Sequence, residues 1–333
     1  MRFIDNCIKY KLFEVQNKFE ENTESEIGVV IAVSGGADSL ALADLLNKSK
    51  NRFKLKLCIA HFEHGLRGKE SIDDAEFVKE FADERKLDCV VESGNVRSYA
   101  ESKKLSIETA ARELRYNFLK DICQKLNYNF IALAHHADDQ AETILMRILR
   151  GAGSVGLSAM RAKTGNLLRP LLTFRKSELE EYCRQQNIIP RIDSTNFETN
   201  TTRNKIRLDL LPKLKEYNPI IVETLCRLGD STAEDADFIQ NEALKIFPET
   251  IRRKDNLELS QKKIIVQHVA MQRAIIRLFV EKSTGSIKDF GFIHFESIRR
   301  VLTDNLKGVE LPHKFRADLK KGWLSIKKEE NQN

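Results

Sequence analysis

The sequence predicts an α/β fold, with a doubly wound parallel sheet followed by a mainly helical region and a small α+β part at the C-terminal end. Short β-branched runs alternate with segments of helical spacing up to about residue 150, the pattern of a parallel sheet covered by helices on both faces. After the loop Gly151–Gly156 the alternation stops and helical spacing dominates. We therefore expect one domain over 1–215 and a second, mainly helical region over 216–333.

The predicted elements follow a regular order. An amphipathic N-terminal helix precedes the acidic stretch Glu20–Glu26. Strands are expected at 28–33, 56–60, 89–91 and 130–134, and helices at 40–46, 73–86, 108–126 and 138–149. Further on we expect helices at 175–187 and 204–215, a polar loop at 190–202, mostly helical stretches over 219–247 and 261–304, and short alternating pieces around Val309 and Trp323. Ligands bind at the carboxyl ends of strands in such sheets, and Ser34 and His135 each follow a predicted strand.

Composition narrows the class of protein. The chain has 333 residues, 41% hydrophobic and 31% charged, which is a globular balance. Its net charge of +6 is unevenly spread, because residues 1–150 hold 23 basic and 25 acidic side chains whereas residues 151–333 hold 32 and 24. The second half is therefore the better candidate for contacting a polyanion.

Membrane and metal-cluster classes are not favoured. No apolar run approaches the roughly 20 residues that span a bilayer, and Met1–Tyr10 lacks the apolar core of a secretory signal. The six cysteines are scattered and form no CxxC pair. Reduced cysteines in a cytoplasmic protein without a membrane partner are the simplest interpretation.

The strongest local signal is the segment Ser34-Gly35-Gly36-Ala37-Asp38-Ser39, between a predicted strand and a predicted helix. Glycines let backbone N–H groups close around an anion, and the helix N-terminus adds a partial positive charge there. No Lys follows, so the segment is not a Walker loop. It resembles the PP-loop of the ATP pyrophosphatases. That resemblance implies that these six residues bind ATP at its pyrophosphate part while a substrate oxygen attacks the α-phosphorus.

Asp38 is an anion beside this predicted phosphate site. A bridging Mg²⁺ would resolve the repulsion, which makes Asp38 the candidate metal ligand. Capping of the following helix is the alternative interpretation.

Two other segments carry polar residues that suit nucleotide contact. His61-Phe-Glu-His-Gly-Leu-Arg67 follows the second predicted strand, with an ordinary polar turn as the alternative. Glu108, Arg112 and Arg115 share one helical face. An exposed ion pair on a helix contributes only about 0.3–0.5 kcal/mol, so an ordinary solvated pair is the simpler interpretation of that face.

The segment Ala134–Thr143 is more informative. His135, Asp139 and Glu142 are spaced by four and three residues and share one face of a predicted helix. Such spacing also occurs in zinc sites, which is the competing chemical interpretation. Because the same predicted sheet carries a phosphate loop, the carboxylates could instead hold Mg²⁺ or a cationic amine. A purely structural alternative is that Asp138 and Asp139 complement the positive charge of the helix N-terminus.

These segments occur in one order with several others. The further blocks are Leu145–Gly151, Gly156–Met160, Arg169–Leu172, Asp193–Asn196 and Arg203–Arg207. Over about residues 28–215 the ordered set resembles the tRNA(Ile)-lysidine synthetase family. The resemblance implies a PP-loop ATP-binding catalytic domain over 1–215 and a basic tRNA-binding region over 216–333.

The resemblance also implies an activity and a set of roles. Such enzymes use ATP to ligate L-lysine to C2 of the wobble cytidine in tRNA(Ile) with a CAU anticodon, through an adenylated cytidine, and release AMP and pyrophosphate. The implied catalytic residues are Asp38, His135, Asp139, Glu142 and Arg203. Asp139 would help to deprotonate the lysine amine. The implied ATP contacts are Ser34–Ser39, His61, Arg112 and Arg115.

The same resemblance assigns the tRNA contacts to basic stretches. Residues 151–215, with 12 basic and 6 acidic side chains, would bind the anticodon stem, and residues 251–333, with 18 and 10, would bind the acceptor side. Another PP-loop tRNA-modifying activity, such as thiolation, and a non-catalytic tRNA-binding protein are the alternatives. A homodimer is compatible with the sequence, which does not determine the oligomeric state.

Overall fold

The computed structural model describes residues 1–333 except 15–25, 66–68, 159, 192–200, 255 and 330–333. The described residues form two compact units, Met1–Thr143 with Met160–Cys226, and Ile144–Ala159 with Arg227–Asn333. The boundary in the sequence prediction lay near residue 215, and the structural units change at 226. The acidic stretch after the first helix, Arg67 and the block Asp193–Asn196 fall outside the described residues in whole or in part.

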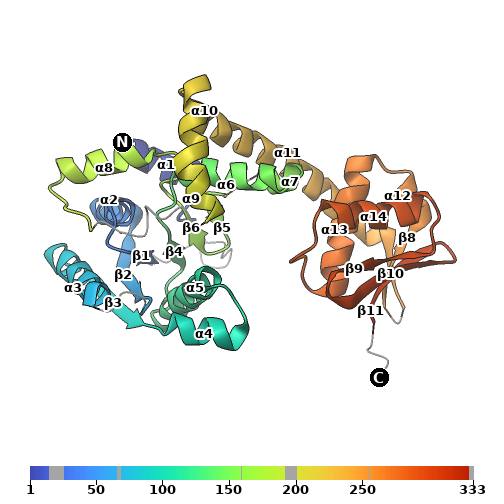
Figure 1. Cartoon of the computed structure of the whole chain (residues 1–333), viewed down its shortest axis with the longest axis horizontal. Coiled ribbons are helices and arrows are strands. Elements are labelled where there is room, and N and C mark those ends of the chain that lie inside the picture. The colour runs from blue at the N-terminus through green and yellow to red at the C-terminus, as the bar shows by residue number, and fades with distance from the viewer. Residues whose placement is uncertain (15–25, 66–68, 159, 192–200, 255, 330–333) are drawn as a thin grey trace. The chain divides into compact units, whose positions relative to one another are not determined.

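The sheet of the first unit has six strands in the order β3-β2-β1-β4-β6-β5 (Figure 1). They are β1 (Ile27–Ala32), β2 (Leu55–Glu63), β3 (Asp88–Ser93), β4 (Phe130–Ala132), β5 (Lys163–Thr164) and β6 (Leu167–Leu168). Neighbours are parallel except for the β5–β6 pair, which is antiparallel. The predicted parallel sheet is confirmed, and the two-residue strands β5 and β6 are too short for a periodic signal.

Helices cover both faces of this sheet, as the doubly wound prediction requires. Val29 and Ile31 of β1 pack into a cluster with residues of α2, α3 and α8, whereas Val30 packs with Phe118 and Leu119 of α5. Alternate side chains of one buried strand therefore stabilise opposite layers. The helices of this unit are α1 (Arg2–Lys9), α2 (Ala37–Phe53), α3 (Lys69–Glu84), α4 (Val96–Lys103), α5 (Ile107–Lys125) and α8 (Lys176–Gln185).

Four further helices complete the first unit, and the first and last of them continue in sequence into the second. α6 (Ala137–Leu149) begins after β4, and α11 (Ile221–Thr250) follows α9 (Thr202–Lys205) and α10 (Leu211–Tyr217). A π-helical turn, Ile206–Leu210, joins α9 to α10. The predicted helix over 204–215 is thus present but contains a π turn, a feature that often marks functional positions.

The second unit has its own core and a five-stranded antiparallel sheet in the order β7-β8-β11-β10-β9. Phe279 and Ile298 are fully buried between this sheet and its helices. The strands are β7 (Ile251–Arg253), β8 (Leu257–Ser260), β9 (Gly308–Leu311), β10 (Phe315–Lys320) and β11 (Trp323–Lys328). The helices are α7 (Ser154–Leu157), α12 (Gln261–Ile265), α13 (Val269–Thr284) and α14 (Phe292–Thr303).

One expectation for this part of the chain is confirmed and one is corrected. The segment predicted as mostly helical over 261–304 contains three helices, separated by turns at 266–268 and 285–291. The loop Gly151–Gly156 contains the start of the short helix α7. Among the described residues, no helix combines the length and the apolar character that crossing a membrane requires.

Candidate active site

The phosphate loop, residues 34–39, runs from the end of β1 into the first turn of α2. Gly35 has a φ of +89°, a conformation that favours glycine. Gly36 has a φ of −79° and is the N-cap of α2, so the expected positive φ is found at Gly35 and not at Gly36. The Ser39 hydroxyl donates to the Gly36 carbonyl at 2.9 Å and accepts from the Ser34 N–H at 3.1 Å. These bonds fix the turn with the helix N-terminus directed at its open side.

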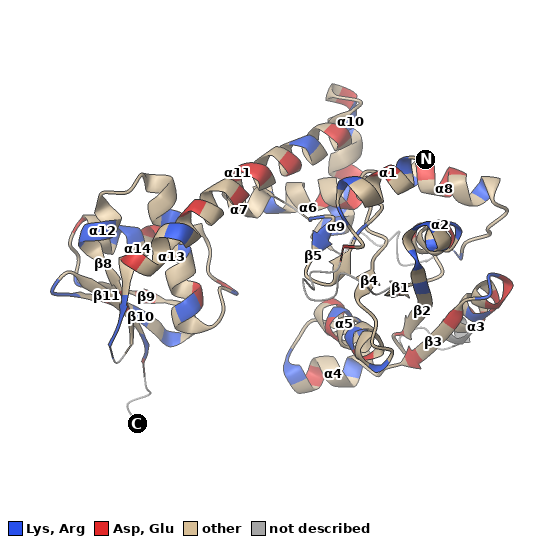
Figure 2. Ribbon diagram, turned by 180° about the vertical axis from the view of Figure 1, so that it is seen from behind, with Lys and Arg blue, Asp and Glu red and all other residues tan. Residues whose placement is uncertain are grey.

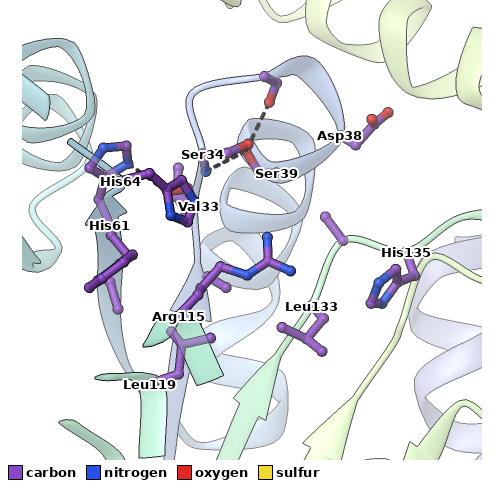
Figure 3. A pocket seen from close by; sticks show the side chains of 15 residues that line it. Val33, Ser34, Asp38, Ser39, His61, His64, Arg115, Leu119, Leu133 and His135 are labelled. Carbon is purple, nitrogen blue, oxygen red and sulfur yellow. Dashed lines mark hydrogen bonds between the residues drawn. The ribbon is translucent and has the colours of Figure 1, made fainter. Parts of the chain in front are cut away.

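A cavity of about 380 Å³ opens beside this loop, at the carboxyl ends of β1, β2 and β4 (Figure 3). Its walls include the apolar side chains of Phe62, Leu119 and Leu133 together with polar groups from the loop. An apolar wall next to anion-binding amides suits a nucleotide, whose base and phosphates need these two surroundings.

Three buried polar atoms at this cavity have no hydrogen-bond partner among the described residues: Oδ1 of Asp38, Nε of Arg115 and Nδ1 of His135. Buried polar atoms without a partner are unfavourable by about 1–3 kcal/mol each. Their grouping around one cavity indicates that a bound molecule supplies the missing partners.

Only one of the two predicted arginines of α5 reaches the cavity. Arg115 extends into it beside Leu119, and its burial lowers the pKa of the guanidinium (Figure 3). Arg112 is exposed and lies against the Tyr116 ring, 4.9 Å from its centroid. The simple solvated pair that the sequence favoured is therefore wrong for Arg115, and neither Arg112 nor Glu108 lines the described cavity.

His61 lies within β2 and not in a turn after it, since the strand continues to Glu63. Its side chain is buried. Its Nδ1 lies 2.9 Å from the Val33 carbonyl oxygen, just before the phosphate loop. The ring also lines the 380 Å³ cavity. His61 therefore connects the second strand to the loop and contributes to the cavity wall, so the polar-turn interpretation is incorrect for this residue.

A second cavity, of about 740 Å³, also borders the loop. It shares Ser34, Gly36, Asp38 and Arg115 with the first cavity. Its remaining lining residues include His136, Asp139 and Arg207. We call the 380 Å³ cavity the apolar cavity and the 740 Å³ cavity the charged cavity. The phosphate loop lines both of them.

His136, which the sequence analysis did not select, is buried in the wall of the charged cavity. Its Nε2 lies 3.5 Å from Oδ2 of Asp38 and 3.6 Å from Oδ2 of Asp139, and its Nδ1 lies 3.8 Å from Oδ2 of Asp138. Burial alone lowers the pKa of His136, but the Asp38 hydrogen bond and the charges of Asp139, Asp38 and Asp138 outweigh it and raise the pKa above its usual value. His136 therefore favours the imidazolium form.

His135 has the opposite electrostatic environment. Burial lowers the pKa of His135 to about 4. The charge of Asp139 raises this pKa, but the positive charges of Arg169, Arg115 and Arg203 lower it. The ring lines the apolar cavity and is neutral at pH 7. Two adjacent histidines thus face different cavities with different charges.

Glu142 and Asp139 form an ion-pair cluster with two arginines. The Glu142 side chain is 1% exposed and accepts from Nε of Arg203 and from Nε of Arg207, both at 2.6 Å. Asp139 accepts from Nη2 of Arg203 at 2.7 Å. A buried carboxylate needs such partners. The cluster brings together residues about sixty positions apart and includes the predicted Arg203, whereas Arg207 was not predicted as a site residue.

The carboxylates fit a single divalent cation at Asp38 better than a zinc centre. Oδ1 of Asp38 is buried without a partner at the phosphate loop, and Mg²⁺ typically uses one or two carboxylates together with substrate phosphates. The described residues contain no group of three or more His, Cys, Asp or Glu side chains arranged to hold a metal ion. His135, Asp139 and Glu142 do not converge as a zinc-binding set would.

Known proteins resemble the chain in sequence. A family model described as the PP-loop domain matches residues 7–214. The tRNA(Ile)-lysidine synthase of Clostridium acetobutylicum is 35% identical over 325 residues, which are 96% of this chain and 70% of that protein. The chain belongs to the tRNA(Ile)-lysidine synthase family. The predicted family membership and the ATP-binding nature of the PP-loop domain are thereby confirmed.

Other matches define how far the likeness extends. The tRNA(Ile)-lysidine synthase of Clostridioides difficile is 38% identical over 283 residues, 84% of this chain and 61% of that protein. The chain therefore spans 70% and 61% of the lengths of these two relatives. The U34-tRNA thiolase NcsA from Methanococcus maripaludis shares the fold, with a TM-score of 0.54, 18% identity, and coverage of 70% of this chain and 79% of that chain.

Proposed function

We propose that this tRNA(Ile)-lysidine synthase family member ligates L-lysine to C2 of the wobble cytidine in tRNA(Ile) with a CAU anticodon. The C2 oxygen attacks the α-phosphorus of ATP, forming an O–P bond and releasing pyrophosphate. The lysine ε-amine then forms a bond to C2, loses one proton, and displaces AMP. The observation that carries the proposal is the position of the phosphate loop, at the junction of an apolar cavity and a charged one.

The apolar cavity suits the nucleoside part of ATP, and the loop suits its phosphates. Arg115 lines both cavities, so it can contact a phosphate from either side. The departing pyrophosphate gains negative charge as the α-phosphorus is attacked. Loop amides, the helix N-terminus and the Arg115 cation oppose that charge without reorganising.

Asp38 is the residue that would hold Mg²⁺, through its unpaired buried oxygen. When bound, the ion would neutralise charge on the phosphates. His136, 3.5 Å from the other Asp38 oxygen, fixes the orientation of this carboxylate.

The charged cavity suits the lysine substrate. Asp139 faces it and carries a lowered pKa, because His136 and Arg203 together outweigh its burial. Such a carboxylate is a weak proton acceptor, and a lysine ammonium would share Asp139 with Arg203, which donates to it at 2.7 Å. Both oxygens of Glu142 are engaged by Arg203 and Arg207, so Glu142 is a positioning residue for these arginines.

Phosphate contacts from basic residues suit the tRNA. Lys and Arg residues occur along helices and strands of the second unit (Figure 2). Residues 251–333 contain 18 basic and 10 acidic side chains. We assign tRNA binding to this region together with the basic stretch 151–215, and we expect binding to weaken steeply as salt rises.

Incorporation of labelled lysine tests the proposal. Protein, ATP, Mg²⁺ and lysine are incubated with a CAU-anticodon tRNA(Ile) transcript or with the same transcript carrying a wobble uridine. We expect label only in the cytidine transcript, with one AMP and one pyrophosphate formed per lysine. Failure to label either transcript, with protein that is folded and binds ATP, would contradict lysine ligation and leave thiolation or simple tRNA binding as the alternatives.

A further inference from the structure

The second unit contains a cavity of about 450 Å³ that the proposed reaction does not use. One wall is the glycine-rich segment 150–156, which follows α6. The opposite wall comes from α13 and the start of α14, and α11 contributes two residues. Arg147 donates to the Gly156 carbonyl oxygen at 2.5 Å, which holds the glycine-rich segment to the end of α6.

Three aromatic rings line this cavity. Phe290 and Phe295 are 8% and 7% exposed, with ring centroids 6.3 Å apart, so they form its interior surface. Phe292 is 51% exposed and faces Gly153, where an added Cβ would lie 3.8 Å from the ring. An exposed ring at the edge of an apolar cavity offers a face on which a planar group can stack.

The charge of the lining is entirely positive. Arg150, Arg273 and Arg277 contribute to the cavity, and none of the described residues that line it is Asp or Glu. Arg273 lies 5.1 Å from the Phe292 centroid and is held by Glu296 at 2.6 Å. Arg277 lies 5.4 Å from the Phe295 centroid, and burial lowers its pKa against the opposing charge of Glu281. The cavity therefore combines stacking surfaces with arginine side chains that can meet a phosphate.

We propose that this cavity binds one unstacked nucleobase of an RNA strand, stacked on Phe292, with a flanking phosphate at Arg277. RNA is recognised mainly through unpaired bases that stack on aromatic side chains or guanidinium planes. Lys and Arg outnumber acidic residues over 251–333, so the surrounding chain also favours a polyanion. The inference rests on the proposed function, which makes the partner a tRNA, and it adds a base-binding site outside the ATP-binding unit.

Binding of a CAU-anticodon tRNA transcript, measured by fluorescence anisotropy at fixed salt, tests the site. We expect Phe292→Ala to weaken binding about tenfold, equivalent to about 1.4 kcal/mol. Phe292→Tyr, which keeps the ring, should restore the wild-type affinity. Arg277→Gln should weaken binding and lower the slope of log Kd against log salt by about one. The matched control is Phe238→Ala, a ring 68% exposed on α11 outside the cavity lining, and it should bind like the wild type.

A fluorescent base analogue locates the occupant. With 2-aminopurine placed at one unpaired position at a time, one position should change its fluorescence on binding, and Phe292→Ala should abolish that change. Wild-type affinity in both Phe292→Ala and Arg277→Gln would overturn the site. Cytidine monophosphate binding as tightly as the transcript would also overturn it, because the occupant would then be a free nucleotide.

The controls separate this inference from the function itself. ATP affinity and circular dichroism should be unchanged in all four variants, which shows that they fold. If the wild type labels the cytidine transcript with lysine and the Phe292 and Arg277 variants bind RNA normally, the inference falls and the function stands. If no tRNA binds the wild type at low salt, both fail.

Discussion

Replacing each glycine of the phosphate loop by alanine should change a different property: Gly35→Ala the stability of the fold, and Gly36→Ala the affinity for ATP. Gly35 has a φ of +89°, and an added Cβ there would lie 3.7 Å from Phe77 and 3.8 Å from Arg191, which is ordinary contact. The change therefore acts through backbone strain alone, about 1–2 kcal/mol for a non-glycine residue. Gly35→Ala should lower the free energy of unfolding by that amount.

Gly36→Ala should leave folding nearly unchanged. Its φ of −79° and ψ of 160° suit any residue, and an added Cβ would lie 3.7 Å from the Ser34 hydroxyl. Gly36 lines both cavities, whereas Gly35 is not among the described lining residues. The new methyl group would keep a phosphate away from the loop amides. Losing one charge-assisted hydrogen bond, about 1.5–3 kcal/mol, weakens ATP binding roughly ten- to a hundredfold.

Urea unfolding followed by circular dichroism measures the first effect, and titration calorimetry with ATP measures the second. The pair serves as its own control, because each variant should change mainly one quantity. Wild-type ATP affinity in a folded Gly36→Ala protein would refute the assignment of this backbone to phosphate binding. An unchanged unfolding free energy in Gly35→Ala would refute the strain argument.

Three other changes test the charged cavity. Glu142→Gln removes the carboxylate shared by Arg203 and Arg207 and should lower the free energy of unfolding, measured with urea, by about 3 kcal/mol. The control Asp209→Asn, at an exposed ion pair, should leave this free energy almost unchanged. His136 has a raised pKa, so its stabilising charge is present below its ordinary pKa near 6.5 and is lost as the pH rises through the raised value. The stability of His136→Gln, followed by thermal unfolding from pH 5 to 9, should lack that alkaline decline. Asp38→Asn should abolish the tightening of ATP binding by Mg²⁺, measured by calorimetry with and without the ion, and equal tightening in both proteins would exclude Asp38 as the ligand.

Local chemistry made the fold and the phosphate loop predictable from the sequence. The strand 28–33, the loop and the following helix are contiguous, and their residue types determine their conformations without distant contacts. The same holds for the other buried strands of the first unit, whose β-branched runs are continuous. Strands β7 and β8 of the second unit are short and partly exposed, and they gave no such signal.

The position of His136 could not be predicted from residue spacing, because helical spacing rules apply only within a helix. The spacing of His135, Asp139 and Glu142 implies one shared face only if a helix includes all three. The structure begins α6 at Ala137, so His135 precedes the helix and turns to the apolar cavity. His136, which directly precedes the helix, lines the charged cavity instead. Both histidines thus lie outside the helix, where helical spacing does not predict which of them faces Asp38 and Asp139.

The arginine cluster on Glu142 depends on long-range packing. Arg203 and Arg207 lie about sixty residues beyond Glu142, in a helix interrupted by a π turn. Local periodicity carries no information about such a contact, and Arg203 was selected only through the family resemblance. Arg207, one helical turn later, could have been found by asking which cation follows Arg203 at a spacing of four.

A crystal structure with a non-hydrolysable ATP analogue and Mg²⁺ tests the central claim most directly. The account predicts the triphosphate against the amides of residues 36–39, the base in the cavity beside Leu119 and Leu133, and the metal ion on Asp38. A triphosphate bound at another place in the chain, with this loop empty, would contradict it.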